Sequence, residues 1–500
     1  MKMFLKKDLR CYAVLLLVCL TINLAACNTV TPSVSGPGTT TEANVTDDYV
    51  QITFSESNGY TFEGVGTELD PHIFRSFNLK KGVTEEDWEL ICQRIKAMKL
   101  HKIRVCVMPE WHEPQNENND PMDMDLSAFS WDNEDINSLF MVLDAAEEYG
   151  VDVNLTLWGA HFSKRSWLAY PATSDWVSWV SPPNNLDEWS ENFCALLKYC
   201  FEVKQYTCIK EITSFNEPNG YFDIASYAAK VINLEERLRK EGLRNKVNLC
   251  VSDGGDSSYE WLKSCVTNEQ LEEISDSFTS HFYRGIETEI AALQQISRQC
   301  VDIVAKNGGK TYKCNEFGLT WNDGGDYRDT EANNSFDRGV LEAKMITAFL
   351  GEGCVGLTHW CLFDEYYSAG QLMRRGLWKF KSEDWAIRPV YYAIAMITQH
   401  TEVGSVMYKG AVEDPNLVST ALQGENGWSY LLANDSKEAK KVVLNNKNED
   451  DGTYNMYLYS SETLPTDGSL ALNAVTEVNM NNGAITVEIP ANSFVVLSQN

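Results

Sequence analysis

The stretch Ile209–Gly220, IKEITSFNEPNG, places a short apolar strand directly before Asn216-Glu217-Pro218. Proline cannot donate a hydrogen bond to a sheet and disfavours helix at the residue before it, so the strand should end here. A carboxylate held at a strand end, beside an amide that can bind a ligand, is a candidate catalytic acid. By itself the motif also fits a simple turn, because a short motif needs its structural context.

Strands and helices alternate on both sides of this stretch. The eight predicted strands are Phe62–Gly66, Ile103–Met108, Val151–Trp158, Ile209–Phe215, Val247–Ser252, Ser275–Ser280, Thr311–Asn315 and Val355–Trp360. Strands that alternate with helices imply a parallel sheet, and eight units over roughly 330 residues predict an α/β fold of the (β/α)8 TIM barrel type. A doubly wound open sheet is the alternative, but no Gly-rich phosphate loop supports it.

The pattern changes after the barrel, which we place at residues 49–400. From about Val403 the chain shows short strands with turns at Glu425-Asn426-Gly427 and Asn481-Asn482-Gly483, so residues 401–500 predict a C-terminal all-β sandwich module. An extra strand, Tyr49–Phe54, precedes the first barrel strand. A closed barrel has no free edge for it, whereas a sandwich has edges, so we expect residues 49–61 to pair with the module.

The N-terminus has the pattern of a targeting segment. It begins with a basic region, formed by Lys2, Lys6, Lys7 and Arg10. The apolar run Tyr12–Leu20 that follows is too short for a stable spanning helix, and Leu24-Ala25-Ala26-Cys27 resembles the end of a bacterial lipoprotein signal. That resemblance implies lipidation of Cys27 and membrane attachment in the bacterial cell envelope, facing outside the cytoplasm. An ordinary signal peptide cut near Ala26 is the alternative. Residues 28–48, rich in Thr, Ser, Pro and Gly, predict a flexible linker.

Charge and cysteine content exclude several classes of partner. A formal net charge of -29 argues against nucleic acid, which needs clustered Lys and Arg, and favours a neutral ligand. Of the 14 cysteines, Cys11, Cys19 and Cys27 belong to the N-terminal segment. The remaining odd number cannot all pair, and there is no C-x-x-C, so we predict no disulfide framework and no cysteine metal site.

Several polar residues fall at the carboxyl ends of the predicted strands, where a barrel of this kind has its active site. The second strand carries Arg104, the fourth ends in Asn216-Glu217, the sixth in His281-Phe282-Tyr283, the seventh at Glu316 and the eighth in His359-Trp360. Two carboxylates that face each other across the barrel mouth are the equipment of a glycosidase. One protonates the leaving oxygen, and the other attacks the anomeric carbon.

On these residues the chain resembles clan A of the glycoside hydrolases, the retaining enzymes built on (β/α)8 barrels. The resemblance implies that Glu217 is the acid/base and Glu316 the nucleophile, with carboxyl carbons about 5–5.5 Å apart. It further implies roles for the supporting residues: Asn216 binding the sugar 2-hydroxyl, Tyr283 and Arg104 keeping Glu316 ionised, His281 belonging to the same constellation, and Trp360 forming the stacking floor. We expect the pKa of Glu316 to be lowered by these donors, and that of Glu217 to be raised by burial and by the charge of Glu316.

Family 30 is the closest resemblance within the clan. A strand precedes the first barrel strand, and Arg388-Pro389-Val390-Tyr391-Tyr392 leads into a β-module that ends Pro490-Ala491-Asn492-Ser493-Phe494. Gly64-Val65-Gly66-Thr67 departs from that family's usual glycine- and phenylalanine-rich opening. Families 5 and 39 therefore stay open.

Aromatic residues crowd the segment after the third strand, and aromatic faces bind the C–H faces of sugars. They are Trp158, His161, Phe162, Trp167, Tyr170, Trp176 and Trp179. Trp158, at the strand end, is the candidate subsite wall, while about half of the set would simply pack under the loop. Weaker site candidates are His72, His161 and Glu110. Glu365, Trp378 and Trp385 would border the cleft or lie on the surface.

The sequence thus predicts a retaining β-glycoside hydrolase that acts on a neutral oligo- or polysaccharide. The first alternative is a non-catalytic carbohydrate-binding lipoprotein on a glycosidase-like barrel. The second is a Schiff-base aldolase or a metal hydrolase on the same fold. No strand end offers a lone Lys and the His residues lack ligand spacing, so we expect no cofactor and no metal.

Overall fold

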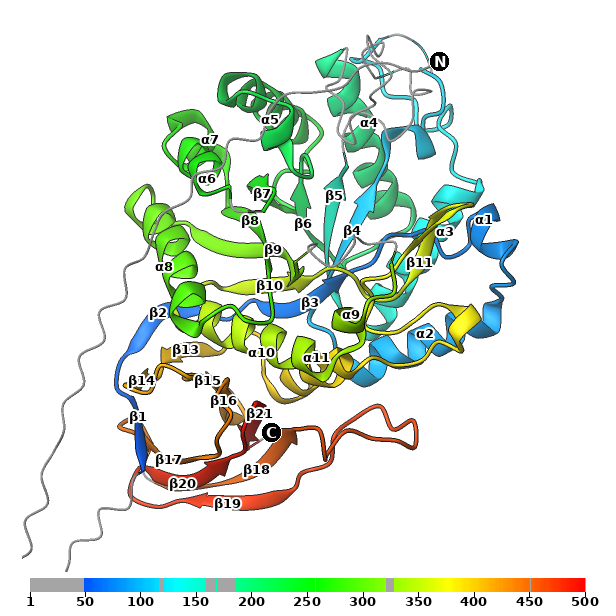
Figure 1. Ribbon diagram of the computed structural model, residues 1–500. Coiled ribbons are helices and arrows are strands. Elements are labelled where there is room, and N and C mark those ends of the chain that lie inside the picture. The colour runs from blue at the N-terminus through cyan, green and yellow to red at the C-terminus, as the bar shows by residue number, and fades with distance from the viewer. Residues whose placement is uncertain are drawn as a thin grey trace, which may run out of the picture. The chain divides into compact units, whose positions relative to one another are not determined.

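The computed structural model describes residues 49–499 except 117, 119, 159–167, 169–184, 257, 321–327 and 450. Within these residues the chain forms a closed parallel barrel and an all-β module (Figure 1). The barrel strands are, in chain order, β3 Gly64–Glu68, β4 Lys102–Val107, β5 Asp152–Leu157, β6 Ile209–Thr213, β7 Asn248–Gly254, β8 Ser277–Arg284, β9 Thr311–Leu319 and β10 Gly356–His359. Neighbours along the chain are neighbours in the barrel, and β10 closes it against β3. The predicted fold class is confirmed.

Helices follow the barrel strands at the spacing that the apolar pattern predicts. They are α1 Ser76–Leu79, α2 Glu85–Met98, α3 Glu134–Tyr149, α4 Leu186–Lys198, α5 Ile224–Lys240, α6 Tyr259–Val266, α7 Glu269–Ile274, α8 Ile290–Lys306, α9 Glu331–Asn334, α10 Phe336–Gly351 and α11 Pro389–His400. A hairpin of β11 Glu365–Ser368 and β12 Gln371–Met373 lies between β10 and α11. Local signals set the helix ends: Thr84 and Asp87 form a capping box on α2, and Gly150 ends α3 in the left-handed conformation.

The all-β module consists of two sheets. Its strands are β1 Val50–Phe54, β2 Ser57–Thr61, β13 Val406–Lys409, β14 Ala411–Val412, β15 Leu417–Gly424, β16 Gly427–Asn434, β17 Lys440–Asn446, β18 Gly452–Tyr459, β19 Thr476–Met480, β20 Ala484–Ile489 and β21 Ser493–Ser498. One sheet has the order β14-β1-β17-β20, and the other β19-β18-β21-β16-β15-β13-β2. Both N-terminal strands therefore belong to the module. β1 is inserted between β14 and β17 rather than added at an outer edge.

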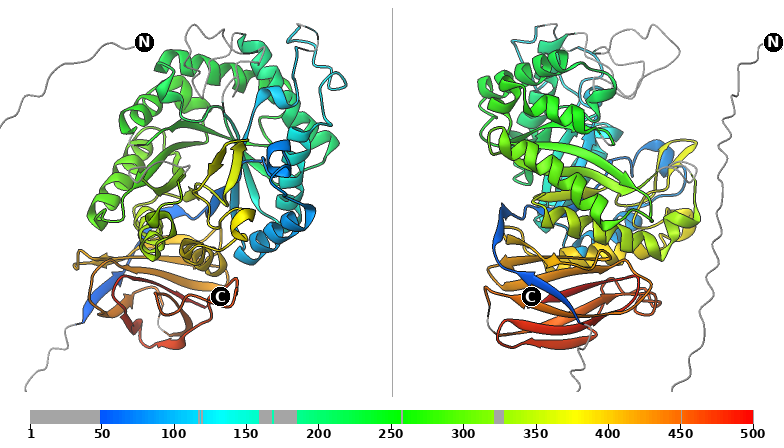
Figure 2. Two further views of the ribbon diagram at one scale, coloured as in Figure 1. Left: turned by 45° about the vertical axis from the view of Figure 1, so that its right-hand side comes forward. Right: turned by 60° about the vertical axis from the view of Figure 1, so that its left-hand side comes forward.

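The module rests on the last two helices of the barrel, α10 and α11, in all three views of Figures 1 and 2. Apolar residues of β13, β15, β16 and β21 share one buried cluster with the barrel core. Hydrogen bonds cross the contact, including Thr420 Oγ1 to Thr347 O at 2.7 Å and Tyr459 OH to Phe336 O at 2.9 Å. A second cluster, which includes Ile52 and Phe54, fills the space between the two sheets.

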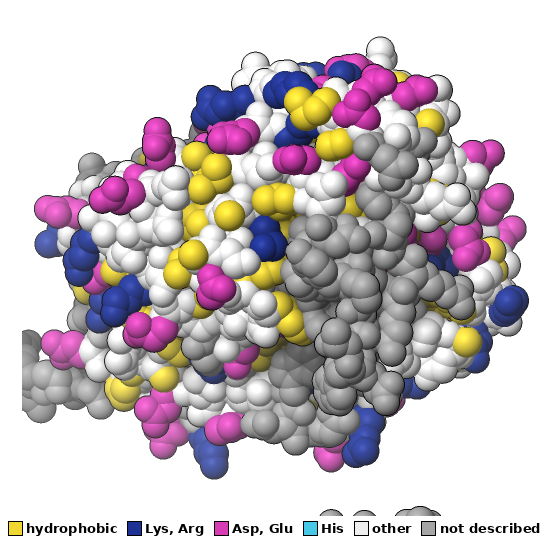
Figure 3. Space-filling model, turned by 90° about the horizontal axis from the view of Figure 1, so that it is seen from above, with side chains coloured by type: hydrophobic (Ala, Val, Ile, Leu, Met, Phe, Trp, Pro, Cys, Tyr) yellow, Lys and Arg dark blue, Asp and Glu magenta, His cyan; other side chains and the backbone are white. Residues whose placement is uncertain are grey.

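Three further features bear on the class of protein. The eleven cysteines of the described residues are all free and buried. Among the helices of the described part, none is long and apolar enough to cross a membrane. On the face shown in Figure 3, acidic and basic side chains are interspersed over the described residues, without a continuous basic patch.

Candidate active site

Glu217 and Glu316 meet at the carboxyl ends of their strands. Glu316 lies inside β9, opposite His281 of β8 at the point where the strand register shifts, and its side chain is 7% exposed. Glu217 follows β6 and its side chain is 41% exposed. One carboxylate oxygen from each, together with a ring nitrogen of His281, lies within 4.8 Å of the others. The structure thus places a buried and a half-exposed carboxylate side by side.

The backbone at Glu217 is held in an uncommon conformation. Its φ of 47° and ψ of 50° lie in the left-handed region, which costs a residue with a Cβ some strain and is found where surrounding contacts enforce it. Here the Glu217 amide donates to Asp253 O at 3.0 Å, and the Gly255 amide donates to Asn219 Oδ1 at 2.8 Å. These bonds tie the Asn-Glu-Pro turn to the end of β7 and aim the carboxylate at Glu316.

His281 connects the two carboxylates. Its Nδ1 lies 3.1 Å from Glu217 Oε1 and 3.5 Å from Glu316 Oε2, while its Nε2 lies 3.3 Å from Asp253 Oδ1. Although burial opposes it, the charges of Glu316 and Asp253 raise the pKa of His281 well above its ordinary value. The imidazole is therefore a cation at neutral pH, placed between the two catalytic candidates.

Arg104 lies beneath this group and is fully buried. Its Nη2 donates to Asn216 Oδ1 at 2.7 Å and to Asp253 Oδ2 at 2.8 Å. Its Nη1 donates to Glu316 Oε2 at 3.0 Å and also to Glu68 Oε2. The arginine thus fixes the amide of Asn216 and three carboxylates at once.

The expected lowering of the Glu316 pKa is wrong. Burial, followed by the charge of Glu68, raises the pKa of Glu316 to about 7. The positive charges of His281 and Arg104 lower this pKa but do not offset the increase. Arg104 lowers the pKa of Glu316 less than His281 does, and the same guanidinium also contacts Glu68 and Asp253. The expected burial of Glu217 is not observed either, since its side chain is 41% exposed.

Tyr283 and Trp360 form the aromatic side of the site. The Tyr283 hydroxyl donates to Glu316 Oε1, and burial, followed by the charge of Glu316, raises its pKa well above the ordinary value. The ring of Trp360 meets that of Tyr283 edge-on at 6.2 Å between centroids and is 4% exposed. Both residues lie in a small buried cluster with Cys361, Tyr367 and Met373.

No family model and no curated protein matches the sequence. Solved structures do match over most of its length. A family 30 subfamily 8 xylanase from Clostridium acetobutylicum aligns with a TM-score of 0.63 at 13% identity, covering 90% of this chain and 98% of the other. Xylanase C from Talaromyces cellulolyticus aligns with a TM-score of 0.64 at 14% identity, covering 89% and 99%. The chain shares its fold with family 30 glycoside hydrolases. An endo-β-1,6-glucanase aligns with a TM-score of 0.61 at 13% identity, covering 89% and 93%.

The remaining site residues predicted from the sequence lie at different positions in the fold. Trp158 follows β5, is half-buried and packs against the barrel core. The other six aromatic residues predicted after it, from His161 to Trp179, lie outside the described residues. His72 is buried beside Trp111 and Tyr367, and burial lowers its pKa well below the ordinary value. Glu110 lies in the short 3-10 helix Pro109–Trp111 that follows β4.

The placement of the two tryptophans beyond the eighth strand at the cleft or on the surface is wrong. Trp378 and Trp385 are both buried, and each packs against Phe363 in the core. Trp385 Nε1 donates to Asp87 Oδ1 at 2.8 Å, which joins the segment before α11 to α2. Glu365 is buried in β11, near Asp70.

Glu68 and Asp253, which belong to the Arg104 cluster, were not predicted as site residues from the sequence. Glu68 ends β3, and Asp253 lies at the end of β7, one residue beyond the predicted strand. Burial would raise the pKa of Asp253, but Arg104 and His281 hold it well below its ordinary value. The rule that selected Glu217 and Glu316, an acid at the carboxyl end of a barrel strand, would have found both.

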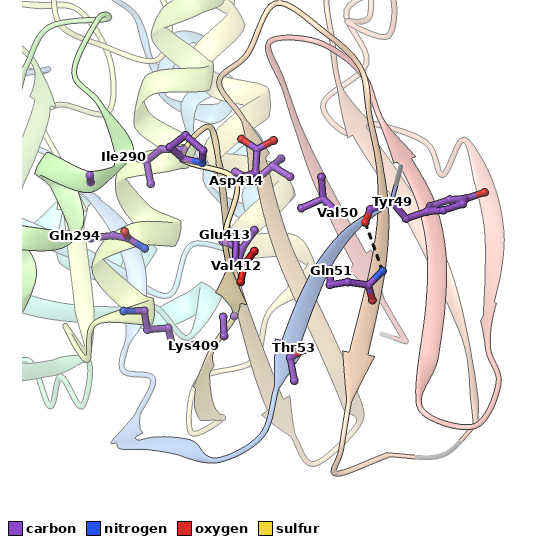
Figure 4. Close-up of a pocket in the computed structure, with 15 residues that line it drawn as sticks. Tyr49, Val50, Gln51, Thr53, Ile290, Gln294, Lys409, Val412, Glu413 and Asp414 are labelled. Carbon is purple, nitrogen blue, oxygen red and sulfur yellow. Dashed lines mark hydrogen bonds between the residues drawn. The ribbon is translucent and has the colours of Figure 1, made fainter. Parts of the chain in front are cut away.

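Two groups in the described residues have the spacing to hold a metal ion: Glu217 with His281 and Glu316, and Glu68 with Asp70 and Cys106. In the first, the protonated imidazole is a poor ligand because metal binding requires neutral histidine. In the second, Arg104 already donates to Glu68. A cavity of about 840 Å³ lies elsewhere, between β1, the start of α8 and β14 (Figure 4). Two of its charged residues, Lys409 and Asp414, pair with Glu352 and Lys440 respectively.

Proposed function

We propose that the protein is a retaining β-glycoside hydrolase that cleaves neutral oligo- or polysaccharides by double displacement. The observation that carries this proposal is the close approach of Glu217 and Glu316. A carboxylate oxygen of each lies within 4.8 Å of the other, and both lie within the same distance of a ring nitrogen of His281. Retaining enzymes hold their two carboxyl groups about 5–5.5 Å apart, whereas inverting enzymes leave room for a water between them. The fold shared with xylanases and an endo-β-1,6-glucanase supports the same reaction class.

The environments of the two carboxylates divide the roles. Glu316 is buried, accepts hydrogen bonds from Tyr283 and Arg104, and forms an ion pair with the imidazolium of His281. These three groups stabilise a negative charge on Glu316, as a nucleophile requires. Glu217 is half-exposed and can reach a leaving group and then a water. In the first step Glu316 attacks the anomeric carbon while Glu217 gives its proton to the departing oxygen. In the second step Glu217 removes a proton from water, which releases the sugar from Glu316.

Two further residues would hold the reacting sugar. Arg104 fixes the Asn216 oxygen at 2.7 Å, so the amide nitrogen of Asn216 is oriented to donate to the sugar 2-hydroxyl. Trp360, backed by Tyr283, would provide the stacking floor, and Trp158 a wall. Because the centre holds several carboxylates, a neutral sugar should bind better than a uronic acid.

The alternative, a carbohydrate-binding protein without activity, predicts binding without turnover. Glu316→Ala should abolish the hydrolysis of every substrate, while Glu217→Ala should be far milder on aryl glycosides with good leaving groups. Azide should then rescue Glu217→Ala to give a β-glycosyl azide and Glu316→Ala to give an α-azide. Exchange of the two products between the variants would reverse the assignment. A wild-type protein that binds β-glycans but hydrolyses none of a panel would support the alternative.

We also propose attachment of the protein to the cell envelope through lipid on Cys27, on the basis of its basic and apolar N-terminal pattern. Residues 1–27 are a signal under this proposal. Cells labelled with a palmitate analogue should yield labelled wild-type protein and unlabelled Cys27→Ala. Equal labelling of both would contradict the anchor.

A further inference from the structure

Glu68 lies below the two catalytic candidates, and the proposed mechanism gives it no role. It is the last residue of β3, and its side chain has no exposed surface. Arg104 Nη1 donates to its Oε2, and Cys106 Sγ lies 3.7 Å from its Oε1. A fully enclosed side chain cannot touch a sugar, so any influence on the reaction must pass through a neighbour.

That neighbour is Arg104, because its donors are divided. Nη1 carries two hydrogens, and its two acceptors are Glu68 Oε2 and Glu316 Oε2, the latter at 3.0 Å. The hydrogens of Nη2 go to Asn216 and Asp253. The nitrogen that faces the candidate nucleophile is therefore shared with a second carboxylate, and the contact with Glu68 is the shorter of the two.

The cluster also holds more carboxylates than cations. Glu68, Asp253 and Glu316 all contact Arg104, and Asp70 lies within 4.8 Å of Glu68. His281 is the second cation, and it contacts Asp253 and Glu316. Buried carboxylates without enough opposing charge keep protons. Burial raises the pKa of both Glu68 and Glu316 to about 7 and that of Asp70 to about 6, so Glu68 and Glu316 are the first of these three to take up a proton.

We propose that Glu68 is a positioning residue that shares Arg104 and one proton with Glu316, and so sets the pH at which Glu316 becomes a free carboxylate. When Glu68 holds the proton, Arg104 Nη1 acts on Glu316 as its charged partner. When Glu316 holds the proton, Arg104 pairs with Glu68 and the nucleophile is blocked. Only the proton moves between the two carboxyl groups. The inference rests on the nucleophile role proposed for Glu316.

The groups that face Glu68 come from several strands. They are Arg104 and Cys106 on β4, Asp70 just beyond β3, His281 and Tyr283 on β8, and Glu316 on β9. The segment after β10 adds Cys361, Glu365 and Tyr367. Arg104 and His281 are the cations of this set, so replacing Glu68 changes the charge balance around Glu316 most directly through Arg104.

Glu68→Gln tests the proposal because it removes the charge and keeps the shape. The acid limb of the pH profile of kcat/KM should move down by about one pH unit or more, since Glu316 no longer competes for Arg104. At pH values above the limb, kcat should stay within about threefold of wild type, because Glu68 does not touch the sugar. Glu68→Ala, which also removes the charge, should shift the limb in the same direction.

A matched control is Glu211→Gln, another buried barrel glutamate held by lysines rather than by Arg104. It should leave the acid limb in place. A purely structural Glu68 would lower stability or kcat without moving the limb, and that result would overturn the proposal.

A second readout does not depend on turnover. In protein labelled with ¹³C at glutamate carboxyl carbons, with Glu316→Gln to assign the signal, the Glu316 titration should move to lower pH in Glu68→Gln. An unchanged titration would overturn the coupling even in an active enzyme. A shifted titration in a protein that hydrolyses nothing would support the coupling and count against the proposed function instead.

Discussion

Replacing Glu211 by Gln should destabilise the barrel strongly at neutral pH and much less in acid. Glu211 lies inside the barrel near the amino ends of the strands and is 7% exposed. It pairs with Lys313, and Lys102 Nζ lies 3.6 Å from its Oε2. Burial would raise the pKa of Glu211, but the charges of Lys102 and Lys313 lower it to about 2.

The magnitude follows from that shift. A fall from the ordinary value of 4.5 to about 2 corresponds to roughly 3 kcal/mol of stability, at 1.36 kcal/mol per pKa unit. A lowered folded-state pKa stabilises the protein above the unfolded pKa, and the contribution is lost as the pH falls through the folded pKa. It should therefore be close to 3 kcal/mol at pH 7 and about 1.4 kcal/mol at pH 3.

Urea unfolding of wild type and Glu211→Gln at pH 7, 4 and 3 measures this difference. Glu63→Gln is the matched control, because Glu63 contacts the same Lys313 at 2.6 Å but its side chain is 35% exposed, so its loss should cost less than about 1 kcal/mol. The same destabilisation by Glu211→Gln at pH 7 and pH 3 would refute the electrostatic reasoning and point to packing.

Three further outcomes are expected. Tyr283→Phe removes the hydroxyl donor to Glu316, so kcat on aryl glycosides should fall about 10- to 100-fold with little change in KM; an unchanged kcat would contradict the contact. Glu316→Gln should raise the unfolding temperature relative to wild type more at pH 8 than at pH 5. The reason is that a carboxyl whose folded pKa is raised to about 7 costs stability as the pH rises from about 4.5 to 7; a pH-independent difference would count against this. Deletion of residues 49–54 removes β1 and the buried Ile52 and Phe54, so thermal unfolding should begin about 5 °C or more lower; an unchanged midpoint would show that the sandwich does not need the strand.

The strand ends were predictable from sequence because the barrel repeats a simple alternation. Apolar runs stopped by polar residues placed Glu217 and Glu316 at the right strands, and barrel topology then brings those strand ends together. Glu68 and Asp253 were missed although the same signal was present. The predicted fifth strand ended at Ser252, one residue before Asp253, and the predicted first strand ended at Gly66, two residues before Glu68.

The electrostatics of the site could not be read from the sequence. Arg104 contacts acids that lie 36, 149 and 212 residues away, and how one guanidinium divides its donors depends on three-dimensional positions alone. The pKa of Glu316 was therefore expected to fall, whereas burial and the charge of Glu68 raise it. Trp378 and Trp385 show the same limit, because loop length and composition did not reveal that the segment folds back into the core.

The position of β1 has a consequence for the order in which the chain can fold. Val50 pairs with Val442, 392 residues later, so the first strand to be synthesised gains its parallel partner only when nearly the whole chain is available. Closing so long a loop is slow, and an unpaired strand edge is prone to aggregation in the meantime. A truncated product would expose β1 as an unpaired apolar segment, which proteases and chaperones recognise. The N-terminal strand can thus complete its pairing only in molecules whose chain extends through β17.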